Sequence, residues 1–190
     1  MNDLEILNQC FEPDFERGIL YFKERPRDHF LSDKSCNIWN NKWAGEISGS
    51  TCVALKDGAP RYYQEIRVSI QGKLFRRYLH RCIYMMYHNI ILDSSQLIDH
   101  IDGNGKNNSI HNIRRCNRQE NKWNSKQKVN GSGHKNVYYE DSPKRKSKWR
   151  VTITKDGKSK SYGYYPTIEE AVEVAKEKRL ELFGEFANDG

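Results

Sequence analysis

Residues 97–124 read LIDHIDGNGKNNSIHNIRRCNRQENKWN and carry the strongest structural signals of the chain. Two apolar residues lead into Asp99 and His100, which indicates a short strand, and Asp102-Gly103-Asn104 then favours a turn. A second strand is expected to begin at Asn112, after another run of turn residues. The segment therefore predicts a hairpin whose first strand carries an acidic residue followed by a histidine.

A helix is expected to follow this hairpin. Asn117 and Glu120 have the spacing of a variant capping box, which places Asn121 in the first helical turn. Strand, turn, strand and helix form a compact frame that can bring Asp99 and Asn121 together.

These residue types suit hydrolysis assisted by a metal ion. Mg²⁺ takes oxygen ligands and often only one or two from the protein, a set that Asp99 and Asn121 would supply, with Mn²⁺ as an alternative ion. Neighbouring side chains point to opposite faces of a strand, so His100 is expected to act as the general base rather than as a second ligand. Asn112 is expected to hold the loop together and to orient His100 through its carbonyl.

The segment resembles the HNH nuclease motif, the ββα-metal fold of phage and intron-encoded endonucleases. In that family the first His is the base, the middle Asn is structural, and the flanking acidic residue and the last motif residue bind the metal, which implies these roles for His100, Asn112, Asp99 and Asn121. Asn121 stands where many members have His, so the resemblance is to the H-N-N variant. The matching residues are Asp99, His100, Asp102, Gly103, Asn104, Asn107, Asn108, Asn112, Arg114 and Asn121.

Upstream sequence extends the resemblance to about residues 3–126, as a β/α extension of the nuclease core. Leu79-His80-Arg81 and the stretch around Gly18 to Phe22 resemble the phage subfamily. We expect His80 to pack on its helix or to contact a phosphate, rather than to act as a second base.

The pattern of apolar and turn residues upstream of the motif predicts the secondary structure of this region. It predicts a helix over 3–12 ended by Pro13, a strand over 19–22, a loop over 25–50, strands over 62–70 and 73–79 joined at Gln71-Gly72, and a helix over 79–87.

Downstream, the pattern changes after Asn130-Gly131-Ser132-Gly133, which is expected to be a linker. Strands are predicted over 135–140, 148–154 and 158–165, followed by a helix with Thr167 as its N-cap. Alternation along the second strand places Val151 and Ile153 toward that helix and Arg150 outward, so Arg150 is favoured over Trp149 as a DNA contact.

Residues 132–188 resemble a second family, the AP2/ERF-type DNA-binding domain. The likeness rests on Lys135 to Tyr139, Lys148 to Val151, Tyr162 to Tyr165, the capped helix and Leu182 to Phe186, with Asn136 where a glycine is usual. In that family the three-stranded sheet lies in the major groove. The resemblance implies DNA contacts from Lys148, Trp149, Arg150, Lys158 and Lys160; a sheet-and-helix domain that binds a protein is the alternative.

The charge distribution favours an anionic partner. The chain of 190 residues carries a net charge of +7, and residues 99–165 alone contain 16 Lys and Arg against 6 Asp and Glu, a net +10. Such clustering is what phosphate contacts require, and near the motif Arg114, Arg115, Arg118 and Lys122 are expected to grip phosphates. Five scattered cysteines contain no CxxC pair, which argues against a zinc ribbon or a disulfide framework. No apolar run is long enough to span a membrane.

The sequence as a whole predicts an α+β protein with an HNH endonuclease part over 1–130, its core at about 95–126, and an AP2-like DNA-binding part over 131–190. We expect a monomeric, Mg²⁺-dependent endonuclease that acts on double-stranded DNA in the cytoplasm, that of the host cell if the chain is phage-encoded. A single site would more naturally nick one strand per binding event. The alternative is a DNA-binding or regulatory protein with a relic nuclease core; RNA or branched DNA also stays open as the substrate.

Overall fold

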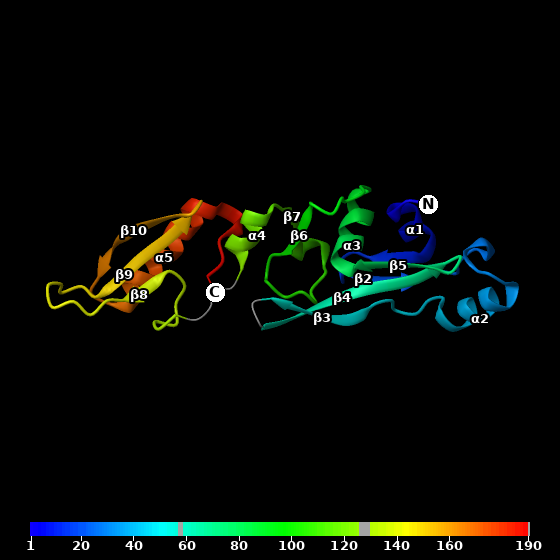
Figure 1. Ribbon diagram of the computed structural model, residues 1–190, viewed down its shortest axis with the longest axis horizontal. Helices are drawn as coiled ribbons and strands as arrows, with labels where there is room; N and C mark the ends of the chain where they lie inside the picture. Colours follow the sequence, from blue (N-terminus) through cyan, green and yellow to red (C-terminus); the bar gives the residue numbers. More distant parts are fainter. Residues whose placement is uncertain (57–58, 126–129, 190) are drawn as a thin grey trace. The chain divides into compact units, whose positions relative to one another are not determined.

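The structure, a computed structural model, describes residues 1–56, 59–125 and 130–189. It is a mixed α+β fold with several small antiparallel sheets (Figure 1), in agreement with the α+β class that the sequence predicts. Two compact units are present, Met1–Cys116 and Asn117–Gly190. The helix α4 (Arg118–Asn124) therefore belongs to the second unit, although it precedes the division at 130–131 that the sequence pattern predicts.

The first unit contains three antiparallel sheets and three α-helices among its described residues. One sheet pairs β1 with β2, one has the order β3-β4-β5, and one pairs β6 with β7. The elements are α1 (Asp3–Cys10), β1 (Phe11–Asp14), β2 (Ile19–Phe22), η1 (Arg27–His29), α2 (Asp33–Trp43), β3 (Ser50–Lys56), β4 (Ala59–Ile70), β5 (Lys73–Tyr78), α3 (Leu79–His88), β6 (Leu97–His100), η2 (Ile110–Asn112) and β7 (Ile113–Cys116).

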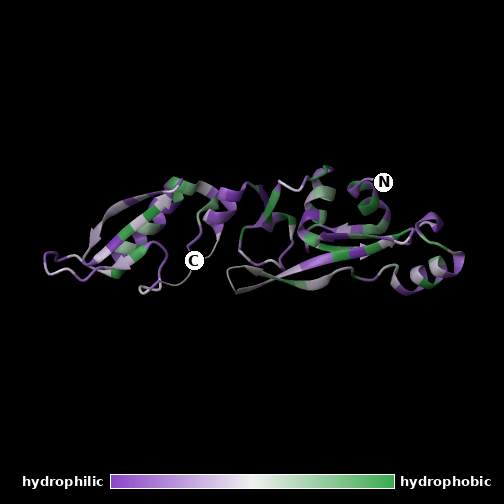
Figure 2. Ribbon diagram, viewed as in Figure 1, coloured by the Kyte–Doolittle hydropathy of each residue, from purple (hydrophilic) through white to green (hydrophobic). Residues whose placement is uncertain are grey.

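Helix α3 supplies much of the core of this unit. Its buried residues Leu79 and Ile83 belong to one apolar cluster with Leu7 of α1, Leu20 of β2 and Ile66 of β4. Figure 2 shows hydrophobic and hydrophilic residues mixed along the strands that border the helix. Burial of this apolar surface fixes α3 between the sheets, so the two residues that follow Leu79 in its first turn have a defined position.

The hairpin predicted from strands 62–70 and 73–79 is confirmed, and so is the helix predicted over 79–87. Gln71 and Gly72 have φ angles of 48° and 76°, the left-handed backbone that a tight two-residue hairpin turn requires. Strand β2 has the predicted bounds.

Two predictions in the N-terminal region are wrong. The helix expected over 3–12 ends at Cys10, because Phe11 to Asp14 pair as a strand with β2 and Pro13 lies inside that strand, opposite Leu20. The expected loop over 25–50 contains α2, whose N-terminus is capped reciprocally by Ser32 and Ser35. This pair of serines is a capping signal in the sequence.

The second unit is a three-stranded antiparallel sheet with a helix packed on it, as predicted. Val151 and Ile153 are buried against Ala171 and Ala175 of the helix, which confirms the predicted inward face of the central strand. Thr167 caps the helix by accepting a hydrogen bond from the Glu170 amide. The elements are α4, β8 (Val137–Tyr139), β9 (Trp149–Lys155), β10 (Lys158–Tyr165), α5 (Ile168–Phe183) and η3 (Gly184–Phe186), with the sheet order β10-β9-β8.

Helix α4 is attached to this unit by packing and hydrogen bonds. The Trp123 ring stacks on Phe183 with centroids 4.8 Å apart. The Lys135 ammonium donates to the carbonyl oxygens of Trp123, Ser125 and Asn188 at 2.9–3.1 Å. These contacts explain why the helix groups with the C-terminal sheet.

Residues 130–133, predicted as a linker, form a hydrogen-bonded turn. The Asn130 side chain donates to the Val137 carbonyl, and the Ser132 hydroxyl donates to the same carbonyl. The turn residues that suggested a linker thus tie the start of β8 in place. None of the described helices is long and apolar enough to cross a lipid bilayer.

Candidate active site

The β6–β7 hairpin holds the two residues on which the nuclease prediction depends. Asp99 pairs with Arg114 across the hairpin and His100 pairs with Ile113. Asp99 and His100 are 7% and 6% exposed, so both are polar residues held in a mostly buried position. Their side chains have different neighbours, as strand alternation predicts.

The loop that follows is organised by Asn112. Its side-chain oxygen accepts from the Asp102 amide at 3.1 Å, and its nitrogen donates to the Asp102 carboxylate at 2.9 Å and to the Asn107 carbonyl at 2.7 Å. The backbone carbonyl of Asn112 also accepts from the Ile101 amide at 2.8 Å. Asn112 thus connects both ends of the loop, the kind of role that the sequence suggests for it.

Hydrogen bonds also fix the charge of Asp102. Burial by itself would raise the pKa of this carboxyl, but hydrogen bonds from Asn104, Asn107 and Asn112 outweigh burial and lower the pKa below its ordinary value. The loop is therefore built around a carboxylate that stays ionised at neutral pH.

The His100 ring is oriented by Asn108, a motif residue to which the sequence assigned no role. The Asn108 side-chain oxygen lies 3.0 Å from Nε2 of His100, and its nitrogen donates to Oε1 of Gln64 at 2.7 Å and to the Lys106 carbonyl at 3.3 Å. Because a backbone carbonyl only accepts, the Asn108 nitrogen must face Lys106 and its oxygen must face His100. The neutral imidazole therefore carries its proton on Nε2, and Nδ1 is its basic nitrogen.

The turn between β1 and β2 packs against the backbone of Asn108. Gly18 has a φ of +64°, and a Cβ atom placed on it would lie 2.1 Å from the Asn108 carbonyl carbon. The Ile110 amide donates to the Phe15 carbonyl at 2.9 Å, one further link between the two segments. The turn between β1 and β2 thus needs a glycine at position 18 for the loop to pack.

Two aromatic rings lie against His100, and a third packs on one of them. The His80 ring meets the His100 ring edge-on with centroids 4.9 Å apart, Tyr63 lies 6.2 Å away from His100, and Tyr78 stacks on His80 at 5.6 Å. Burial first and the neighbouring His100 second lower the pKa of His80 to about 3, so this imidazole is neutral. His80 thus packs on α3, and its ring also lies beside His100, the candidate base.

The Asp99 carboxylate suits a hard cation but also contacts a guanidinium. Its Oδ2 lies 3.3 Å from a terminal nitrogen of Arg114, a side chain that is only 11% exposed. A carboxylate is the kind of oxygen donor that Mg²⁺ prefers, and Mg²⁺ needs few protein ligands. In the described residues no three His, Cys, Asp or Glu side chains converge as metal ligands. Asp99 thus offers part of an oxygen donor set.

The other predicted residues of the motif lie at the surface or in the second unit. Arg115 is exposed on β7, whereas Arg114 is enclosed beside Asp99. Asn121 is half-buried on α4 of the second unit, where Arg118 and Lys122 are exposed.

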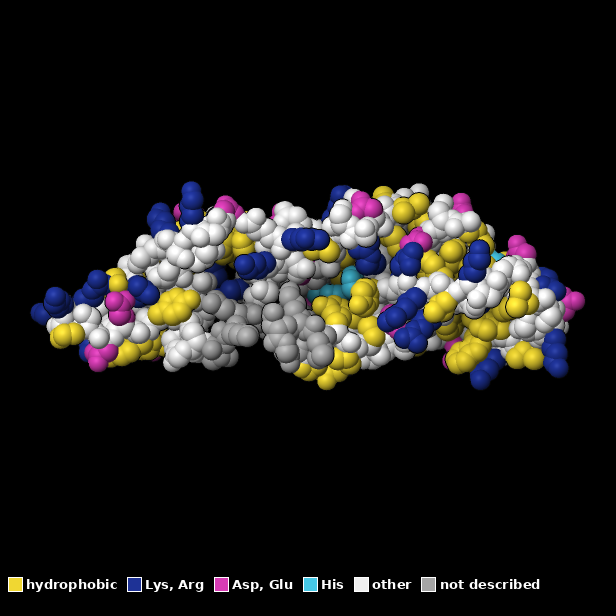
Figure 3. Space-filling model, viewed as in Figure 1, with side chains coloured by type: hydrophobic (Ala, Val, Ile, Leu, Met, Phe, Trp, Pro, Cys, Tyr) yellow, Lys and Arg dark blue, Asp and Glu magenta, His cyan; other side chains and the backbone are white. Residues whose placement is uncertain are grey.

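On the second unit, the predicted DNA contacts lie on β10 and on or directly before β9. Lys148 is paired with Asp141, and Arg150 lies 3.4 Å from Glu140. Trp149 is half-buried and packs against the apolar cluster of the unit, while Lys158 and Lys160 are exposed. Figure 3 shows Lys and Arg side chains at the surface of both units.

Comparisons with known proteins give two relatives. Over 91 residues the chain is 37% identical to Protein 3.8 of Escherichia phage T7, an alignment that covers 47% of this chain and 72% of that protein. Over 109 residues it is 30% identical to a protein of Acanthamoeba polyphaga mimivirus named as an uncharacterized HNH endonuclease, covering 57% of this chain and 54% of that protein. No sequence-family profile matches the chain. No solved structure matches it either.

Proposed function

The chain belongs to the family of Protein 3.8 of Escherichia phage T7, and from the geometry around His100 we propose that it is a metal-dependent DNA endonuclease of the HNH type. The observation that carries the proposal is a buried histidine whose Nε2 lies 3.0 Å from the side-chain oxygen of Asn108, next to a carboxylate on the same strand. The likeness to a viral protein named as an HNH endonuclease supports the same assignment. The phage relative is compatible with action in the cytoplasm of an infected cell.

In the proposed mechanism His100 removes a proton from water through Nδ1. Asn108 keeps the imidazole in the tautomer that has its lone pair on this nitrogen, so no rearrangement is needed before proton transfer. Asn112 keeps the loop that carries Asn108 in place through Asp102 and Asn107. A general base contributes about 10²–10⁴-fold to the rate of such a reaction.

Of the two metal ligands that the sequence indicates, Asp99 lies on the first unit and Asn121 on the second. Asp99 is the ligand that the geometry around His100 supports. A bound Mg²⁺ or Mn²⁺ would stabilise the charge that develops on the phosphate and on the leaving oxygen. Arg114 holds one Asp99 oxygen in position, and its guanidinium offsets the negative charge of a carboxylate that is mostly buried.

We further propose that the C-terminal sheet anchors the enzyme on double-stranded DNA in the AP2-like manner. The outer face of β9 presents Arg150, while Val151 and Ile153 face the helix. Lys158 and Lys160 are exposed on β10, but they pair with Lys155 and Ile153 and therefore lie on the face that carries the helix. Arg150 is thus the predicted contact on which the proposal rests. Attachment through a second module raises the local concentration of DNA at the nuclease site.

The deciding experiment is cleavage of supercoiled plasmid with Mg²⁺, with Mn²⁺ and with EDTA, for wild type, His100→Ala and His134→Ala. His134 is an exposed histidine of the second unit, so its substitution controls for loss of an imidazole. Metal-dependent product that His100→Ala abolishes and His134→Ala retains supports the proposal, and nicked circles before linear DNA fit a single site. DNA binding without cleavage by wild type would instead favour a DNA-binding protein with a relic core.

A further inference from the structure

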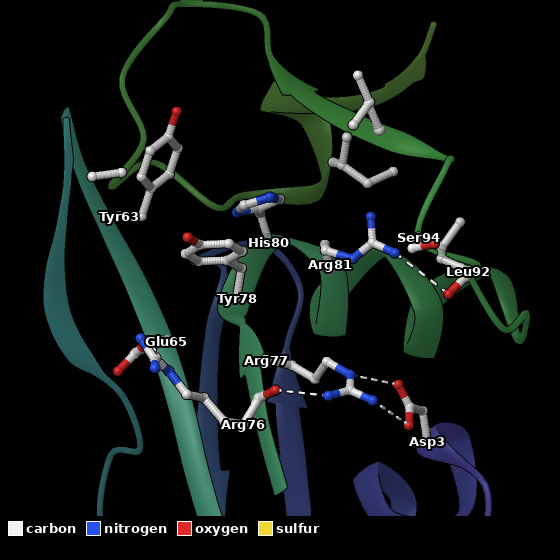
Figure 4. Close-up of a pocket in the computed structure, with 13 residues that line it drawn as sticks. Asp3, Tyr63, Glu65, Arg76, Arg77, Tyr78, His80, Arg81, Leu92 and Ser94 are labelled. Carbon is white, nitrogen blue, oxygen red and sulfur yellow. Dashed lines mark hydrogen bonds and ion pairs between the residues drawn. The ribbon is translucent and has the colours of Figure 1, made fainter. Parts of the chain in front are cut away.

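A groove of about 890 Å³ opens on the first unit beside α3 and is lined by arginine and aromatic side chains. Figure 4 shows His80 lying over the Tyr78 ring at the head of the groove, with Arg81 beside it and Arg76 and Arg77 further along. The residues that give the groove its character are Tyr63, Arg76, Arg77, Tyr78, His80 and Arg81.

The N-terminus of α3 opens into this groove. Tyr78 is the N-cap residue and makes no capping hydrogen bond with its side chain. The first amides of a helix have no partner within the helix, and together with the helix dipole they attract an anion. Tyr78, His80 and Arg81 all line the groove, so this positive helix end faces its interior.

A second observation points to a ligand at the same place. His80 is 6% exposed, and its Nδ1 is buried without a hydrogen-bond partner. Buried polar atoms are nearly always satisfied in native proteins, so an unsatisfied one at the head of a groove indicates that a bound group completes the site.

The charge of Arg81 strengthens the attraction for an anion. Its guanidinium donates to the carbonyl oxygens of Gln96 at 2.5 Å and Asp93 at 2.8 Å, and no carboxylate pairs with it among the described residues. Neutral acceptors fix the side chain but leave its positive charge uncompensated. Because His80 beside it is buried, the Arg81 charge lies in surroundings of low polarity, where its attraction for an anion is stronger.

The other arginines near the groove are paired with acidic residues, and the net charge of these pairs is positive. Arg67 and Arg76 share the carboxylate of Glu65, which is 1% exposed, and Arg77 makes two bonds to Asp3 at 2.6 and 2.9 Å. Two guanidinium groups on one carboxylate leave one net positive charge near the groove, although of the two only Arg76 lines it.

We propose that the N-terminus of α3, with His80 and Arg81, is a phosphate-binding subsite that holds a phosphodiester of the nucleic acid beside His100, while the groove wall carries the adjoining strand. The proximity of the two histidine rings, 4.9 Å between centroids, places the subsite next to the candidate base. Tyr63 and Tyr78 offer aromatic faces to the strand, as in many nucleic-acid grooves. This inference rests on the proposed nuclease function.

The test measures binding of a fluorescent DNA duplex in EDTA, where no cleavage occurs, as a function of salt. His80→Phe keeps the ring packing and deletes both nitrogens, and Arg81→Gln removes the charge. The matched controls are His88→Phe at the other end of α3 and Lys73→Gln, an exposed residue of β5 outside the groove lining. We expect each groove variant to weaken binding by roughly tenfold, and Arg81→Gln to reduce the salt slope by about one.

A measurement on the unmodified protein makes the test independent of variant folding. The backbone amide resonances of Leu79, His80 and Arg81 are expected to shift on addition of the duplex in EDTA. Unmoved amides, or groove variants that bind as the controls do, would overturn the subsite even if the wild type cleaves DNA. If wild type neither binds nor cleaves DNA, the proposed function fails and the inference with it.

Discussion

Nε2 of His100 and the side-chain oxygen of Asn108 are 3.0 Å apart in a buried position, and this contact sets the tautomer of the histidine. Asn108 in turn bonds to Gln64 of β4, so the ring orientation depends on a strand more than thirty residues upstream. The orientation of His100 on the β6–β7 hairpin therefore depends on a contact with β4 of the β3-β4-β5 sheet.

Asn108→Ala is expected to lower kcat by about 10- to 100-fold, because loss of an orienting partner frees the His100 ring. DNA affinity in EDTA should remain near the wild-type value, since Asn108 is 1% exposed and cannot contact DNA. Single-turnover cleavage and anisotropy binding measure the two effects. Asn104→Ala, an exposed residue of the same loop, is the control, and equal kcat in both variants would contradict the role.

Gly18→Ala is expected to destabilise the protein by about 2–5 kcal/mol, the sum of a left-handed backbone and a contact with the backbone of Asn108. Gly45→Ala provides the comparison: its φ is +85°, but nothing lies within 4 Å of the added Cβ. Strain alone should then cost about 1–2 kcal/mol. Urea unfolding measures both, and equal losses would show that the close approach at Gly18 carries no energy.

Glu65 is expected to make stability depend on acid pH. Burial alone would raise the pKa of this carboxyl, but hydrogen bonds from Arg76 and Arg67 outweigh burial and lower it. A carboxyl whose pKa is lowered in the folded state stabilises the fold above its unfolded pKa of about 4.3 and loses this contribution as the pH falls through the folded value. Glu65→Gln should therefore melt below wild type at pH 7, and the gap should close below about pH 4. A gap that is constant over this range would contradict the assignment.

Arg150→Ala is expected to weaken DNA binding by about three- to tenfold without unfolding the second unit, because its side chain lies on the outer face of β9. The salt slope of binding should fall by about one as one phosphate contact is lost. Lys176→Ala removes the same charge from α5, whose exposed face is acidic, and serves as the control. Equal affinities would place the DNA-contacting surface elsewhere.

Much of the secondary structure was readable because its signals are local. The capping residues Asn117 and Thr167 and the turn at Gln71-Gly72 act within a few residues, and each lies where the sequence pattern predicts. The strand at Phe11 was missed because its partner is the strand at Ile19, a pairing that the apolar pattern of the helix before it does not reveal.

The sequence by itself determined the α+β class, the hairpin turn at Gln71-Gly72 and the capped helices that follow Asn117 and Thr167. It also indicated candidate roles for Asp99, His100 and Asn112, since all these signals rest on residue types at fixed spacing. Only the tertiary structure brought Gly18, Gln64 and His80 to the site, and only it placed the positive end of α3 in an arginine-lined groove. These residues reach one another through packing of distant segments, and their sequence separation carries no periodic signal of that contact.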